Sequence, residues 1–137
     1  MRILALDHGA VRIGVAVSDE LKIIAQPLEF IPAEDTTAAL KRLLEILRDK
    51  EVELILVGMP RNMDGSYGPA AEKVRAFVRE IQAITSVGVR TWDERLTSTQ
   101  ANRVLVDAGV RREKRKEKVD AMAAAVLLQS FLDCQSG

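Results

Sequence analysis

The stretch LALDHGAVRIGVAVSD, residues 4–19, constrains the fold more than any other part of the chain. Its first apolar run is unbroken up to Asp7, which is typical of a central strand covered on both faces. After the short link DHGA, residues 12–18 alternate between large apolar side chains and small or polar ones. Such a short link predicts two antiparallel strands. Asp7 therefore ends a strand, where it either forms part of a turn or holds a ligand.

The rest of the chain predicts an alternation of helices and strands. An extended segment at 22–31 contains Pro27, which favours an edge strand or a bulged one. The expected order is strands at 2–7, 11–18 and 22–31, a helix at 36–50, a strand at 54–58, a helix from Pro69, a strand at 87–94, and helices after Thr97 and from Val119. Three leading strands form a meander, and right-handed crossovers then add parallel strands. The chain is therefore expected to form one mixed-sheet α/β domain over residues 1–137.

The composition excludes several classes of protein. Twenty basic residues balance 20 acidic ones, so the net charge indicates no partner. A lone cysteine, Cys134, cannot form an intramolecular disulfide and favours a reducing compartment. No apolar stretch approaches the ~18 residues of a membrane span, and the N-terminus does not resemble a signal peptide. We expect a soluble cytoplasmic protein that does not interact with membranes.

Acidic residues follow two of the predicted central strands. Ligands of open α/β sheets bind at the carboxyl ends of the strands. Asp7 ends the first strand, and Asp93 and Glu94 end the strand at 87–94. Because consecutive strand residues point to opposite faces, only one of Asp93 and Glu94 can join Asp7. The same alternation turns His8, the only histidine, away from Asp7 and disfavours a role as general base.

A fourth acid, Asp120, falls within the apolar face of the last predicted helix. A charged carboxylate on a buried face is costly unless a cation meets it. The neighbouring Ala123 and Ala124 are small enough to let this helix approach the sheet and carry Asp120 towards Asp7. Converging carboxylates repel one another, and hard divalent cations such as Mg²⁺ or Mn²⁺ compensate them while leaving positions open for phosphate oxygens. This pattern indicates metal-dependent phosphoryl chemistry.

Four segments of the chain resemble one known family. LDHGAVRIGVAVSD, GMPRNMDGSYGP, WDERLTST and KRKEKVDAMAAAVLLQSFLD are similar to the YqgF/RuvX family of pre-16S rRNA nucleases, which are related to RuvC-type Holliday junction resolvases. The segments run in order and cover nearly the whole chain. The resemblance implies an RNase H-like mixed five-stranded sheet with helices on both faces. It also implies catalytic and metal-binding roles for Asp7, Glu94 and Asp120, and processing of the 5′ end of pre-16S rRNA.

Basic residues near these acids predict a nucleic-acid interface. The run at 111–118 holds six Lys or Arg against two Glu and leads directly to Asp120. Aromatic residues make up only 4% of the chain, which favours recognition through the phosphate backbone and shape over base stacking. The candidate nucleic-acid-binding residues are Arg12, Arg61, Asn62, Arg95, Lys114, Arg115 and Lys116.

Several functions remain open on the sequence alone. An RNA precursor is favoured over a DNA four-way junction, because symmetric junction resolution needs two sites in a dimer and no apolar dimer seam is visible. The protein is expected to be a monomer or a homodimer. A Holliday junction resolvase and a non-catalytic nucleic-acid-binding module are the alternatives. The first segment also resembles the phosphate motif of actin-like ATPases, but the chain lacks a second such motif.

Overall fold

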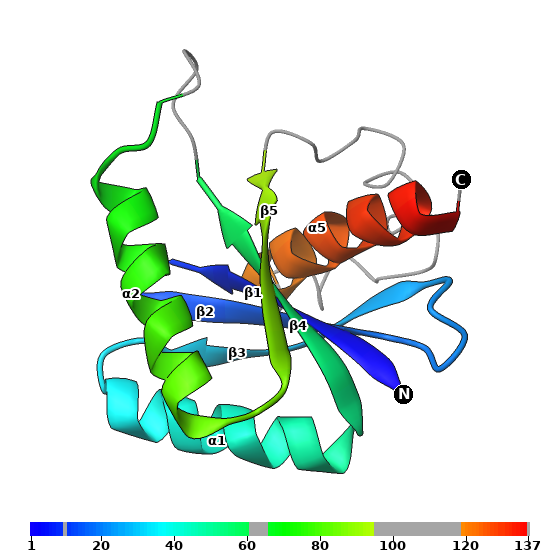
Figure 1. Cartoon of the computed structure of the whole chain (residues 1–137), viewed down its shortest axis with the longest axis horizontal. Coiled ribbons are helices and arrows are strands. Elements are labelled where there is room, and N and C mark those ends of the chain that lie inside the picture. Colours follow the sequence, from blue (N-terminus) through cyan, green and yellow to red (C-terminus); the bar gives the residue numbers. More distant parts are fainter. Residues whose placement is uncertain (10, 61–65, 95–118, 137) are drawn as a thin grey trace.

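A mixed sheet with helices on both faces forms the framework of the protein (Figure 1). The computed structural model describes residues 1–9, 11–60, 66–94 and 119–136. Its elements are β1 (Arg2–His8), β2 (Arg12–Ser18), β3 (Ala25–Pro32), α1 (Thr36–Asp49), β4 (Val52–Met59), α2 (Pro69–Ile84), β5 (Gly88–Asp93) and α5 (Val119–Ser136). The expected helix after Thr97 lies outside the described residues. All other expected elements are confirmed in type and order.

Within the described ranges, the sheet has five strands in the order β3-β2-β1-β4-β5. β2 pairs antiparallel with both β1 and β3, whereas β4 pairs parallel with β1 and β5. β3 is an edge strand, and its register with β2 shifts between Val15 and Ala16, next to Pro27. Proline lacks the N–H that a regular ladder needs, which explains the irregularity at this edge. The predicted five-stranded mixed sheet and the bulged edge strand are both confirmed.

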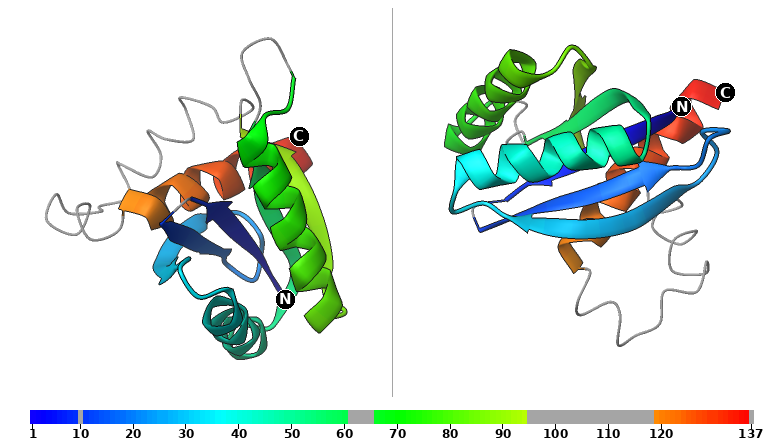
Figure 2. Two further views of the ribbon diagram at one scale, coloured as in Figure 1. Left: turned by 90° about the vertical axis from the view of Figure 1, so that its left-hand side faces the viewer. Right: turned by 90° about the horizontal axis from the view of Figure 1, so that it is seen from below.

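The two faces of the sheet have different coverings (Figure 2). α1 and α2 pack on one face, where large side chains from alternate strand positions meet residues such as Leu43 and Phe77. Of the described helices, α5 packs on the other face, where strands and helix contribute small residues such as Ala5, Ala16 and Ala124. The two-residue period of a strand produces this division, because neighbouring residues project to opposite faces.

α5 is fixed to the sheet by polar as well as apolar contacts. Gln129 is buried, and its Oε1 accepts a hydrogen bond from the backbone N–H of Ala25 at 2.9 Å. Its Nε2 donates to the carbonyl oxygen of Ile23 at 3.0 Å. These bonds join the helix to the hairpin between β2 and β3. None of the helices in the described ranges is both long and apolar enough to cross a membrane.

Candidate active site

Asp7 lies at the carboxyl end of the central strand β1, on the face covered by α5. It shares that face with Ile3 and Ala5, which pack with the α5 cluster. Gly14 of β2 is its cross-strand partner, and Gly58 of β4 follows the Leu6–Val57 pair on the other side. Asp7 is therefore flanked by a glycine on each neighbouring strand. This leaves space around its carboxylate while the strand beneath it is held on both sides.

Glu94 is the acid that meets Asp7. It directly follows β5 and shares the α5 face with Trp92, whereas Asp93 shares the opposite face with Val89. Burial of the Glu94 carboxyl, its side-chain hydrogen bond with Asp7 and the negative charges of Asp7 and Asp93 raise the pKa of Glu94 to about 7. The structure therefore brings Glu94, and not Asp93, to the first acid.

Gly58 is a part of this site that our sequence analysis missed. A Cβ atom at this position would lie 2.9 Å from Oε1 of Glu94 and 3.1 Å from Cδ2 of Leu127. The signal was present in the sequence, because a glycine interrupts the buried apolar run of β4. Glycine inside a strand often marks the close approach of another group.

The third predicted acid, Asp120, lies in the first turn of α5, and its side chain is outside the described part of the structure. Figures 1 and 2 show that α5 begins beside the carboxyl end of β1. Ala121, Ala124 and Ala125 are fully buried, so the helix approaches the sheet closely in its first turns. This backbone placement supports the predicted approach of Asp120 to the other acids, and the role of its side chain stays a prediction.

His8 lies on the opposite face from Asp7, as the alternation of β1 requires. Its ring packs against the ring of Phe77 from α2, with centroids 4.7 Å apart. Burial is the main cause that lowers the pKa of His8, and the nearby charge of Asp7 opposes it. These contacts give His8 a packing role behind the site.

Of the predicted nucleic-acid-binding residues, only Arg12 lies in the described ranges. It is exposed, belongs to the same face of β2 as Gly14, and its guanidinium lies 5.0 Å from the centroid of the Phe30 ring. This places a cation two residues along β2 from Gly14, the cross-strand partner of Asp7. The other candidates are outside the described residues: Arg61, Asn62, Arg95, Lys114, Arg115 and Lys116.

The donor atoms at this site fit a hard divalent cation. Asp7 and Glu94 offer only carboxylate oxygens, which Mg²⁺ and Mn²⁺ prefer. The raised pKa of Glu94 reflects burial and carboxylate repulsion, both of which a bound cation would offset. Among the described residues no group of three or more acidic, histidine or cysteine side chains could hold a metal. The third predicted ligand is Asp120, whose side chain is outside the described part of the structure.

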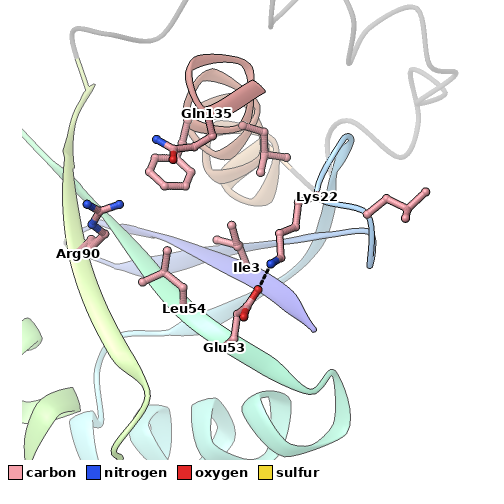
Figure 3. A pocket seen from close by; sticks show the side chains of 9 residues that line it. Ile3, Lys22, Glu53, Leu54, Arg90 and Gln135 are labelled. Carbon is pink, nitrogen blue, oxygen red and sulfur yellow. Dashed lines mark ion pairs between the residues drawn. The ribbon is translucent and has the colours of Figure 1, made fainter. Parts of the chain in front are cut away.

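A separate cavity of about 500 Å³ lies at the amino ends of β1 and β4, away from this site (Figure 3). Ile3 and Leu54 line it from the sheet, and Phe131 lines it from α5. Its carboxylate, Glu53, forms an ion pair with Lys22. Among its described lining residues, this cavity therefore has one carboxylate, already paired with a lysine, and lacks the converging carboxylates found at the carboxyl ends of the strands.

Solved structures identify the fold. The chain superposes on RuvC of Thermus thermophilus in complex with a Holliday junction substrate, with a TM-score of 0.58, 17% identity, and coverage of 100% of this chain and 97% of that one. A complex of the fowlpox virus resolvase with Holliday junction DNA matches with a TM-score of 0.61 and 13% identity over 100% of both chains. The fold is thus the RNase H-like fold of RuvC-type proteins.

The family follows from the sequence. A model described as "RuvX: Holliday junction resolvase" matches residues 1–134, and the chain belongs to this family. A relative from Halothermothrix orenii, named "Putative pre-16S rRNA nuclease", is 46% identical over 99% of this chain and 97% of its own length. A relative of the same name from Symbiobacterium thermophilum is 48% identical, covering 99% of this chain and 94% of its own. The predicted family and fold are confirmed.

Proposed function

We propose that this chain is a metal-dependent endonuclease that hydrolyses phosphodiester bonds, with residues 1–137 acting as one RNase H-like domain. The contact between the carboxyl groups of Asp7 and Glu94, at the carboxyl end of the central strand, carries this proposal. Membership of the RuvX family and the names of the relatives support it. A non-catalytic binding module would have no need of two converging carboxylates whose repulsion destabilises the fold.

In this mechanism Asp7, Glu94 and Asp120 hold Mg²⁺ or Mn²⁺. A cation held there would supply positive charge against the phosphate oxygens and would lower the pKa of an attacking water. Asp7 keeps its carboxylate fixed because β1 is hydrogen-bonded on both sides. Gly14, the cross-strand partner of Asp7, leaves room for the sugar-phosphate backbone to approach Asp7. Arg12, on the same face, binds a neighbouring phosphate and holds the strand in place.

The proposed substrate is the 5′ end of a pre-16S rRNA precursor. The relatives with 46% and 48% identity carry the name of that activity. A single acidic site in each chain also suits a flexible strand better than a symmetric four-way junction. The second candidate is a Holliday junction resolvase acting on DNA as a homodimer. The description of the family model favours that alternative.

The decisive test is a cleavage assay on matched pre-16S rRNA fragments and DNA four-way junctions, with Asp7→Asn as the control. We expect cleavage of the RNA with Mg²⁺ or Mn²⁺, poor cleavage with Ca²⁺, and none in EDTA or with the variant. Robust cleavage in excess EDTA would disprove metal dependence. Symmetric cutting of junctions without cutting of RNA would establish the resolvase instead.

The basic residues Lys114, Arg115 and Lys116 are proposed to bind phosphates without base preference. Replacing all three by alanine should weaken substrate binding and reduce the slope of log K against log salt by about 2 to 3. Binding is measured with a cleavage-inactive Asp7→Asn background, so that the substrate stays intact. An unchanged slope would show that these residues face solvent in the complex.

A further inference from the structure

We propose that Gly58 is a positioning residue of the candidate site, because its missing side chain provides the space that Glu94 occupies beside Asp7. In this arrangement the edge strand β5, and not the neighbouring strand β4, supplies the second carboxylate. The inference deepens the proposed function and rests on it for its consequence in catalysis. Its structural part concerns where the carboxyl group of Glu94 lies.

The sheet register shows why Glu94 needs this space. Gly58 pairs with Trp92 on β5, and Glu94 follows two residues later on the same face. To reach Asp7 on β1, the side chain of Glu94 must cross β4, which lies between β1 and β5. The crossing point is Gly58, where a Cβ atom would lie 2.9 Å from Oε1 and 3.2 Å from Cγ of Glu94.

α5 limits the other side of this space. Cδ2 of Leu127 would lie 3.1 Å from a Cβ atom at position 58, and Leu127 is buried in the cluster beneath α5. An added methyl group therefore meets a packed helix on one side and the end of a flexible glutamate on the other. The glutamate moves at lower cost, because its χ angles can change without disturbing the core. Alanine at this position should displace the carboxylate and preserve the fold.

The first experiment measures Mn²⁺ binding by calorimetry on the metal-free protein, together with thermal unfolding. Gly58→Ala should weaken Mn²⁺ binding about 10- to 100-fold, as loss of ligand positioning does elsewhere. Gly88→Ala is the matched control, because Gly88 is also a strand glycine and, among the described residues, its Cβ would meet only Cδ1 of Leu54 at 3.7 Å. The control should bind Mn²⁺ as the unchanged protein does. Unchanged Mn²⁺ binding by Gly58→Ala would overturn the proposal.

A relocation experiment tests the position of the carboxylate directly. Glu94→Ala removes the second acid, and Gly58→Asp in the same chain returns a carboxylate to the vacated space from β4. The double variant should bind Mn²⁺ at least about tenfold more tightly than Glu94→Ala alone. No recovery in a double variant that unfolds cooperatively would contradict the proposal.

A second double variant tests whether Gly58→Ala displaces Glu94 or α5. Leu127→Val removes the Cδ2 atom that a methyl group at position 58 would meet, and leaves Glu94 in place. Gly58→Ala combined with Leu127→Val should still bind Mn²⁺ weakly. Full recovery would show that the helix, and not Glu94, moves, and would overturn the proposal. Because these measurements follow Mn²⁺ and not cleavage, they remain informative even if the chain proves not to be a nuclease.

Discussion

The two faces of the sheet share the same strands but differ in what they bury. On the α1 and α2 face, Leu4, Leu6, Val15 and Val57 alternate into a cluster of large aliphatic side chains. On the α5 face, the intervening positions hold alanines, the glycines beside Asp7, and the buried polar groups of Ser18, Gln129 and Ser130. Among the described residues, the first face therefore buries the larger set of apolar side chains, and such burial stabilises the fold.

This difference shows how one domain accommodates a costly site. Carboxylates that repel each other can be tolerated where the opposite side of the same strands is well packed. Small residues on the α5 face serve a second purpose, because they let the helix carrying Asp120 approach the sheet. Because successive strand residues point to opposite faces, residues that stabilise the core and candidate ligands can be immediate neighbours in the sequence.

The largest expected effect is on cleavage, and it tests the assignment of acids to faces. Asp7→Asn and Asp120→Asn should each lower kcat/KM by about a thousandfold or more, because a metal ligand is lost. Asp93→Asn, one residue from Glu94 but on the other face, should change it by less than about fivefold. Circular dichroism confirms that each variant is folded. Equal losses in Asp7→Asn and Asp93→Asn would contradict the division of faces.

The next prediction compares packing on the two faces. Leu43→Ala removes a fully buried side chain from the α1 and α2 face and should destabilise the protein by about 2–5 kcal/mol. Cleavage per folded molecule should be unchanged. Ala125→Leu adds volume beneath α5 and should cost about 1–3 kcal/mol while also lowering cleavage, because α5 is displaced. Urea unfolding and single-turnover assays at a temperature where both variants are folded measure the two effects.

The two faces should also respond to pH in opposite directions in the metal-free protein. The folded-state pKa of Glu94 is raised from 4.5 to about 7, so its contribution to stability is complete below pH 4.5 and is lost as pH rises to about 7. The pKa of His8 is lowered from 6.5, so its contribution is present above pH 6.5 and is lost at lower pH. Melting temperatures in EDTA between pH 4.5 and 8 measure both effects.

Two variants separate these contributions. Glu94→Gln should abolish the loss of stability towards neutral pH, and His8→Phe should reduce the loss towards acid pH while keeping the ring contact with Phe77. Adding Mg²⁺ should reproduce the effect of Glu94→Gln near pH 7, since a cation compensates the carboxylates. A melting temperature in EDTA that rises from pH 5 to 7 equally in Glu94→Gln and in the unchanged protein would disprove the assignment to Glu94.

The smallest expected effect concerns a buried hydrogen-bond donor on the α5 face. The indole N–H of Trp92 is buried without a hydrogen-bond partner among the described residues. The Trp92 ring packs edge-to-face against the Phe131 ring, with ring centroids 5.1 Å apart. Trp92→Phe removes the unpaired donor, which favours stability, and loses apolar contact, which opposes it. We expect a net change within about 1 kcal/mol in urea unfolding. A loss above about 3 kcal/mol would mean that the N–H binds an ordered water.

The sequence predicted the framework because it depends on local patterns. The unbroken run before Asp7 and the helical spacing of Leu40, Leu43 and Leu47 are readable within short windows. Alternation also limited the second acid to one of two neighbours. The family resemblance named Glu94, but deriving that choice from the residues themselves, and recognising Gly58, required the register between β4 and β5, which are separated by α2. Such long-range register depends on tertiary packing that no short window contains.

The bonds from Gln129 to the hairpin between β2 and β3 have a consequence for the timing of folding. They join residues 104 and 106 positions apart in the sequence. Contacts of such separation form late, because a long loop must close before they contribute. During synthesis, β1 to β5 leave the ribosome before α5, at about 5–20 residues per second. Asp7 is therefore made first and Asp120 last, so a nascent chain lacks the proposed set of three acids until α5 docks.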